Sequence, residues 1–363
     1  KRCIYTLLAV VVAGCGGMQR SGKGHPLAAG EVAENPATGL AVEQATGRGA
    51  LAYAAAFSGD GQILASAELF GQFRLVIRTA QGARATNEIA LGPATYDITD
   101  LALSAGGELL WVASRAGTVR SFHRSSGKLA TIWHLGSPVT ALAISPDGVY
   151  AAMGTATGVV CLRRIRDAAL LQCMVAHRGQ ISGLDFSASG SRLASAATAG
   201  EIAVWAVPSL AKVAAKTLGG AVNDIAFSPD QARLAIARSP EPAKLTPERA
   251  RHLQGDGERL RGRVEVWPAT LDGHGVVRLP GHRPAATTVA WLGNRRLLSG
   301  GWDGAVRLWD AAAKPRHALA TLTGIGTLIH DIAVSPDHRR LAIATWIATI
   351  DQPAMVVAQI LYP

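Results

Sequence analysis

Ile144-Ser145-Pro146-Asp147-Gly148 ends an apolar run in a tight turn, and the same chemistry returns along the chain. Proline presets one backbone dihedral, aspartate hydrogen-bonds its own backbone and glycine accepts a positive φ, so together these residues predict a turn between two strands. Versions of this turn follow seven apolar residues, which are Phe57, Leu103, Ile144, Phe186, Phe227, Trp291 and Val334. The sequence therefore contains seven copies of one unit.

The spacing of the copies gives the size of the unit. Successive copies are 41 to 46 residues apart, except for an interval of 64 residues between Phe227 and Trp291. Each turn is followed by β-rich runs such as Arg192-Leu193-Ala194-Ser195 and Ile202-Ala203-Val204-Trp205, and a fourth run closes most units. A period just above forty residues is typical of a four-stranded propeller blade. We therefore expect an all-β, seven-bladed β-propeller with four antiparallel strands per blade over residues 37–363.

The seventh unit is one strand short, because the chain ends soon after Ala354-Met355-Val356-Val357-Ala358. An open strand edge exposes unpaired backbone groups and invites aggregation. Gly39-Leu40-Ala41-Val42-Glu43-Gln44 is an isolated β-capable run before the first unit. We expect this N-terminal strand to close the last blade.

The units resemble WD repeats, and the resemblance is strongest in the sixth. Here three stretches stand at the spacing of the WD40-repeat family, namely Gly281-His282, Leu298-Ser299-Gly300-Gly301-Trp302-Asp303-Gly304 and Val306-Arg307-Leu308-Trp309-Asp310. The resemblance implies a hydrogen-bonded tetrad of His282, Ser299, Asp303 and Trp309. A closed network gives every buried polar group a partner, so we interpret the tetrad as structural and not as a hydrolytic triad.

Other units depart from the tetrad pattern. The fourth has His177, Ser195 and Trp205, but Ala199 stands where the family has aspartate. Most of the remaining units lack the histidine or the tryptophan. For those units we expect apolar packing alone to hold the blades.

The N-terminus has the layout of a secretory signal, in which Lys1 and Arg2 precede an apolar run that ends in small residues. Val12-Ala13-Gly14-Cys15 then resembles the lipobox of bacterial lipoproteins. The resemblance implies cleavage before Cys15 and a lipid on its sulfur. The alternatives are an uncleaved anchor or an incidental apolar tail.

On the lipoprotein interpretation the first 36 residues divide in two. Residues 1–14 are the signal peptide, and residues 15–36 are a lipid-anchored flexible tether, since they are rich in small and polar residues without an apolar period. Gly16 favours the outer membrane, facing the periplasm, over the inner membrane. The segment is too short for a transmembrane helix, which needs about 20 apolar residues.

Two further features are candidates for special chemistry. Cys161 and Cys173 fall on neighbouring strands of the third unit, where an oxidising compartment would favour a disulfide over two buried thiols; both alternatives stay open. Residues 239–262 form an arm inserted in the fifth unit. This arm is either a partner-binding element or a solvated loop, and its basic residues are Arg249, Arg251, Arg259 and Arg261.

The chain shows no motif of a metal, cofactor or catalytic site, such as HExxH, paired CxxC, a phosphate-binding loop or Gly-x-Ser-x-Gly. Its net charge of +10 comes from scattered basic residues, and an export signal conflicts with nucleic-acid binding. The resemblance implies a non-catalytic protein-binding scaffold at a bacterial envelope membrane, with other envelope proteins as partners. The alternative is a periplasmic propeller enzyme or ligand-binding protein, which would need polar or acidic residues at the central channel.

Overall fold

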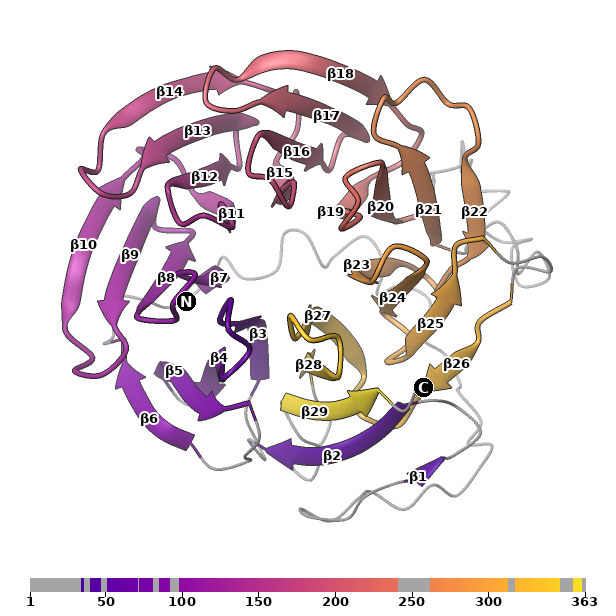
Figure 1. Cartoon of the computed structure of the whole chain (residues 1–363), viewed down its shortest axis with the longest axis horizontal. Coiled ribbons are helices and arrows are strands. Elements are labelled where there is room, and N and C mark those ends of the chain that lie inside the picture. The colour runs from indigo at the N-terminus through magenta and orange to yellow at the C-terminus, as the bar shows by residue number, and fades with distance from the viewer. Residues whose placement is uncertain are drawn as a thin grey trace, which may run out of the picture.

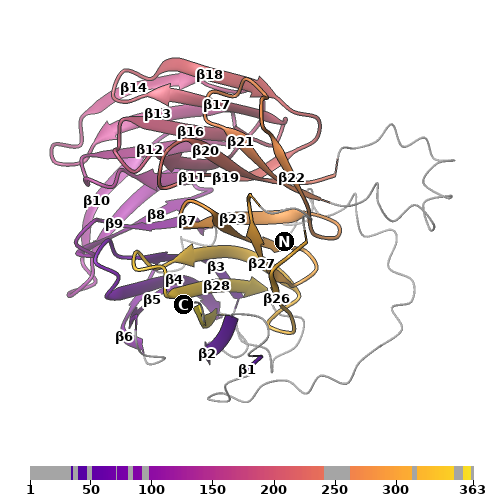
Figure 2. The same ribbon diagram turned by 45° about the vertical axis from the view of Figure 1, so that its right-hand side comes forward.

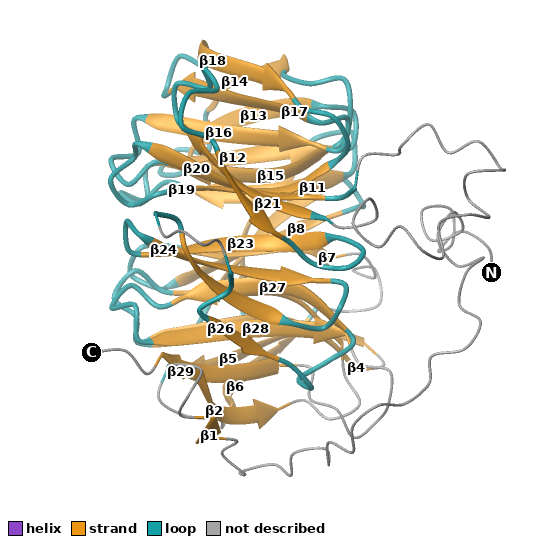
Figure 3. Ribbon diagram, turned by 90° about the vertical axis from the view of Figure 1, so that its right-hand side faces the viewer, coloured by secondary structure: helices purple, strands orange, loops and turns teal. Residues whose placement is uncertain are grey.

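Seven antiparallel sheets are arranged in a ring in the computed structural model (Figure 1). The structure describes residues 34–35, 40–46, 51–70, 72–80, 85–91, 98–240, 262–312, 317–346 and 355–360. Within these ranges every regular element is a β-strand (Figure 3). The expected seven-bladed β-propeller is confirmed.

Each blade is a meander of four strands, numbered here from the innermost strand outward. Blades 1 to 3 consist of β3 (Leu51–Phe57), β4 (Ile63–Phe70), β5 (Gln72–Thr79) and β6 (Ala85–Ala90); β7 (Ile98–Leu103), β8 (Leu109–Ser114), β9 (Thr118–His123) and β10 (Leu129–His134); and β11 (Val139–Ile144), β12 (Tyr150–Thr155), β13 (Val159–Arg164) and β14 (Leu170–Val175). Blades 4 to 6 consist of β15 (Ile181–Phe186), β16 (Arg192–Ala197), β17 (Glu201–Ala206) and β18 (Ala211–Thr217); β19 (Val222–Phe227), β20 (Arg233–Arg238), β21 (Arg263–Pro268) and β22 (Val277–Pro280); and β23 (Ala286–Leu292), β24 (Arg296–Gly301), β25 (Val306–Asp310) and β26 (Ala320–Leu322).

The seventh blade takes its outer strand from the other end of the chain. It contains β27 (Leu328–Val334), β28 (Arg340–Trp346) and β29 (Met355–Ile360), and β2 (Leu40–Thr46) pairs antiparallel with β29. The expected closing strand is thus confirmed, although it begins one residue later and ends two residues later than predicted. A two-residue strand, β1 (Glu34–Asn35), pairs with β2 on the outside.

The predicted turns end the innermost strands. Six of these strands stop at the predicted apolar residue, and β23 runs one residue further, to Leu292. In the turn after β11, the Ser145 hydroxyl accepts a hydrogen bond from the Tyr150 amide at 2.8 Å and donates to Asp147. Gly148 has a φ of 70°, which a residue with a side chain rarely adopts. Local turn chemistry therefore sets where each strand ends.

The apolar core is a ring of seven clusters, one between each pair of neighbouring blades. The cluster between blades 3 and 4, for example, contains Leu162, Ile181 and Leu193, all fully buried. No single centre holds the molecule together. Each blade is stabilised by burying both of its faces against its neighbours, so closure by β2 completes the structure.

Polar side chains also join the blades near the start of the innermost strands. A hydroxyl or amide group there donates to a backbone carbonyl of the next blade at 2.6 to 2.8 Å, and the donors are Thr99, Thr140, Ser182, Asn223 and Thr287. These hydrogen bonds fix the position of each blade relative to the next. They surround the ring's axis, whereas loops gather on its two faces (Figure 3).

Candidate functional site

The four predicted tetrad residues come together in blade 6. His282 lies in the loop between β22 and β23, and its ring bonds Ser299 of β24 at 2.7 Å and Asp303 of the next turn at 2.8 Å. The indole of Trp309 on β25 donates to the Ser299 hydroxyl at 2.8 Å. The imidazole packs so closely against Gly301 that a Cβ there would overlap the ring.

The electrostatics of the tetrad favour a neutral imidazole beside an ionised carboxylate. Burial lowers the pKa of His282, although the Asp303 charge opposes this shift. Burial alone would raise the pKa of Asp303, but the hydrogen bonds and charges of His282 and Arg307 outweigh it and lower this pKa to about 2. Arg307 donates to Asp303 at 2.8 Å and also contacts the His282 ring.

Ser299, His282 and Asp303 are hydrogen-bonded in the same order as the residues of a hydrolytic triad, but a substrate cannot reach the serine. Ser299 and His282 are both 0% exposed, and the Ser299 oxygen already accepts the Trp309 N–H. A nucleophilic serine must reach a substrate carbonyl, which this buried oxygen does not. The network links two strands, the loop before β23 and the turn between β24 and β25, but it offers no site for a reacting group.

Blade 4 contains a related network with a different acid. His177 bonds Ser195 at 2.7 Å, and the Trp205 indole donates to Ser195 at 2.8 Å. Glu201, two residues after Ala199, lies 3.7 Å from the His177 ring and accepts the Arg178 amide at 2.6 Å. Sequence reasoning missed Glu201, although an acid just beyond the expected position was a usable signal.

The expectation that the other blades rely on apolar packing alone is wrong for blades 1 and 5. In blade 1, Arg78 takes the position of the tryptophan, because it pairs with Leu64 as Trp309 pairs with Leu297. Arg78 donates to the Ser66 hydroxyl at 2.7 Å and forms a buried ion pair with Glu68 at 2.9 Å.

In blade 5 a buried carboxylate takes the place of the serine. Arg238 and Glu265 pair at 2.9 Å, and the Trp267 indole donates to the same carboxylate at 2.8 Å. The side chains of this ion pair, and those of the Arg78–Glu68 pair in blade 1, are almost fully buried. Removing one partner would leave an unpaired buried charge, which costs about 3 to 5 kcal/mol.

Four aspartates on the innermost strands were also missed. Asp100, Asp185, Asp224 and Asp331 each accept a backbone amide of the following blade, at 2.6 to 2.9 Å. Burial raises the pKa of Asp100 to about 8, and raises that of Asp185 and Asp224 to about 7. Asp100, Asp224 and Asp331 each follow an apolar and then a polar residue near the start of their strand, as in Ile98-Thr99-Asp100. This repeated pattern was a signal from which the inner aspartates could have been predicted.

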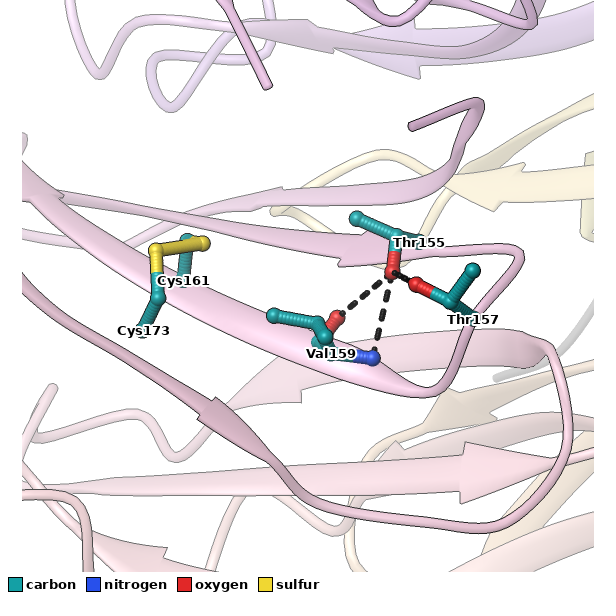
Figure 4. The surroundings of a disulfide bond; sticks show 5 residues. All are labelled: Thr155, Thr157, Val159, Cys161 and Cys173. Atoms are coloured by element: carbon teal, nitrogen blue, oxygen red, sulfur yellow. Dashed lines mark hydrogen bonds between the residues drawn. A yellow bond between two sulfur atoms is a disulfide. The ribbon is translucent and has the colours of Figure 1, made fainter. Parts of the chain in front are cut away.

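Cys161 and Cys173 lie directly opposite each other on β13 and β14. The structure joins them as a disulfide, with the sulfurs 1.95 Å apart (Figure 4). The turn that leads into β13 is held by Thr155, whose hydroxyl accepts the Val159 amide at 3.1 Å and bonds the Thr157 hydroxyl at 3.0 Å (Figure 4). Cys161 is buried whereas Cys173 is exposed at the outer edge of blade 3.

Several predicted residues lie outside the described part of the chain. These are Cys15 and the arm residues Arg249, Arg251, Arg259 and Arg261. Strand β20 ends at Arg238 and β21 begins at Arg263, so the arm joins the second and third strands of blade 5 as expected. In the described ranges no helix is long and apolar enough to span a membrane, and no three His, Cys, Asp or Glu side chains gather as metal ligands.

A pocket of about 440 Å³ lies beside the blade 6 tetrad, and we call it the blade 5–6 pocket. It is lined by Pro280, Gly281, Arg283, Asp303, Arg307, Trp309, His317 and Ala318. Strand β26 pairs with β25 only as far as Leu308, so within the described residues no outer strand pairs with Trp309. The pocket therefore has an apolar wall of tryptophan, proline and alanine, and a polar wall of arginine, histidine and aspartate.

Comparisons with known proteins agree with the repeat pattern. Residues 169–206 and 269–310 match the WD40 family, described as WD domain, G-beta repeat. The chain is 24% identical over 191 residues to WD repeat-containing protein 1 of Bos taurus, an alignment that covers 51% of this chain and 28% of that protein. It is 38% identical over 124 residues to Actin-interacting protein 1-2 of Arabidopsis thaliana, covering 33% of this chain and 20% of that protein.

These alignments support WD40-type repeats in a β-propeller. The two matched segments are the ones that hold the His-Ser-Trp networks of blades 4 and 6. In both alignments the chain spans less than a third of the relative's length.

Proposed function

We propose that this WD40-repeat β-propeller is a non-catalytic protein-binding scaffold, held at a bacterial envelope membrane by a lipid on Cys15. Its partners are other envelope proteins, and its place is the outer membrane, facing the periplasm. The similarity to WD-repeat proteins supports the binding role, since the name of the Arabidopsis relative describes an interaction with another protein. We carry over only that class of partner, and not actin.

The observation that carries the binding role is an apolar surface on the outside of the ring. Six large apolar side chains of β10, β14 and β18 are exposed, and we call them the rim surface: Leu129, Ile132, Leu170, Leu171, Val175 and Val213. Val175 is 78% exposed. These are the outermost strands of blades 2, 3 and 4, and they follow one another along the rim of the ring (Figures 1 and 2).

The rim surface is also free of negative charge, because β10, β14 and β18 contain no aspartate or glutamate. Outer strands of soluble proteins usually carry charges that prevent edge contacts. Strand β18 has two lysines, Lys212 and Lys216, whereas β10 and β14 contain no lysine, arginine, aspartate or glutamate. Exposed apolar side chains concentrated on one part of a protein's surface are typical of a contact with another protein or a membrane. We infer that a partner protein covers it.

The non-catalytic part of the proposal is supported by the closed networks of blades 6 and 4, in which the triad-like serines Ser299 and Ser195 are both fully buried. The alternative of a ligand at the centre of the ring gains support from the four inner aspartates. Yet both carboxylate oxygens of Asp100, and both of Asp331, accept backbone amides. We therefore assign these carboxylates to joining the blades.

The binding role is tested by purifying the protein from its native membranes and identifying co-purified proteins by mass spectrometry. We expect Val175→Lys and Val213→Lys, both at exposed sites, to lose partners that the wild type retains. Val149→Lys is the matched control, because Val149 is 38% exposed but lies in the turn before β12. An unchanged set of partners in all variants would contradict the proposal.

The anchor is tested separately. We expect the intact mass of the membrane-extracted protein to show a diacylglyceryl group on a chain that begins at Cys15. Cys15→Ala is expected to block processing or release the protein from the membrane. A chain without lipid, cut at another residue, would exclude the anchor and leave the binding role to the first experiment.

A further inference from the structure

The blade 5–6 pocket contains a cation, Arg283, that forms no ion pair with any residue in the described part of the chain. Asp303 and Arg307 form an ion pair at 2.8 Å, and the low pKa of Asp303 keeps this carboxylate ionised. These two charges cancel. Arg283 is exposed, and its guanidinium forms no ion pair with any residue in the described ranges.

The arginine at the same position in blade 4 lies near a carboxylate of the chain. Arg178 follows His177 as Arg283 follows His282, and its guanidinium lies 3.7 Å from Glu201. The residue at the equivalent point of blade 6 is Ala305, which is also two residues after the Asp303 position and four before the tryptophan. Glu201 thus faces both the amide and the guanidinium of Arg178, whereas Asp303 accepts the Arg283 amide at 3.4 Å but forms its ion pair with Arg307.

The shape and chemistry of the pocket match a side chain with an apolar stem and an anionic end. Trp309, Pro280 and Ala318 provide an apolar wall, and Arg283 and His317 provide hydrogen-bond donors. An arginine pairs with a carboxylate through two parallel hydrogen bonds, which gives direction as well as affinity. A volume of about 440 Å³ is within the range of ligand pockets.

We propose that the blade 5–6 pocket binds a glutamate side chain from an extended acidic segment of a partner protein, with Arg283 as the residue that pairs with the carboxylate. The partner's carboxylate takes the role that Glu201 plays for Arg178 in blade 4. The inference rests on the proposed protein-binding function. It adds a second contact, polar and specific, on a part of the ring away from the rim surface.

The probe for this site is a fluorescent hexaglutamate peptide, with hexaglutamine as the uncharged control, and binding to the full chain is followed by anisotropy. We expect the glutamate peptide to bind and the glutamine peptide not to bind. Arg283→Ala should weaken binding about tenfold, and Arg283→Glu more, because the change removes or reverses the pairing charge. Arg178→Ala, the matched control, should leave the affinity within about twofold, since that arginine already faces a carboxylate in the chain.

Thermal melts of each variant check that an exposed substitution leaves the fold intact. Equal losses in Arg283→Ala and Arg178→Ala would reveal only the general attraction of a basic surface, and would overturn the proposal. So would equal binding of the two peptides, or displacement of the peptide by millimolar inorganic phosphate, which would make the pocket a phosphate site. None of these outcomes involves the rim surface, so the proposed function would still be decided by co-purification.

Discussion

Replacing His282 by alanine separates a structural role of the tetrad from a catalytic one. The change removes two hydrogen bonds, at 2.7 Å to Ser299 and 2.8 Å to Asp303. Asp303 keeps Arg307 as a partner, but the fully buried Ser299 hydroxyl loses the acceptor on its donor side. One unsatisfied buried group costs about 1 to 3 kcal/mol in the free energy of unfolding, and the cavity left by the ring adds to this loss.

The assay is urea unfolding of the wild type, His282→Ala, Ser299→Ala and the double variant. His282→Ala orphans the Ser299 hydroxyl, and Ser299→Ala orphans both the His282 ring nitrogen and the Trp309 N–H. The double variant leaves only the Trp309 N–H without its partner, so it should lose less than the sum of the two single changes. Strictly additive losses, or an unchanged melting temperature in His282→Ala, would refute the network. Turnover of an ester or lactone that disappears in His282→Ala would refute the structural role and favour an enzyme.

The remaining predictions concern the ring, the disulfide and pH. Deleting the chain through Gln44 should lower the melting temperature far more than deleting it through Pro36, because only the longer deletion removes most of the strand paired with β29; equal melting temperatures would mean that β2 does not close the ring. Non-reducing peptide mapping should find Cys161 joined to Cys173, and alkylation of both thiols without reductant would exclude the bridge. Burial raises the pKa of Asp100 from 3.8 to about 8, so the folded state binds more protons than the unfolded state between these values, and the free energy of unfolding should fall as pH rises from 5 to 8. Asp100→Asn should make this fall shallower in urea titrations at each pH, and an identical slope would show that Asp100 does not titrate in this window.

The architecture could be predicted from the sequence because the turns depend only on residues that are neighbours in the chain. A turn built on serine, proline, aspartate and glycine depends on neighbouring residues alone, so seven copies of it place seven innermost strands. The missing strand of the seventh unit and the isolated run near Leu40 follow from the same count. The blade 6 tetrad was predicted from the resemblance to WD repeats, in which its members stand at fixed offsets within one repeat.

The contacts between blades were not readable in this way. Asp224 accepts the amide of Val289, which lies 65 residues further on, and Asp331 accepts the amide of Ala55, which lies 276 residues earlier in the chain. Such partners are set by which strands the ring brings side by side. The same holds for the blade 5–6 pocket, since Pro280, Trp309 and His317 line one pocket only in the folded chain. The repeated sequence determined the ring and its turns; the tertiary structure decided the polar joints and the pocket, because burial and pairing depend on neighbours about forty or more residues away in the chain.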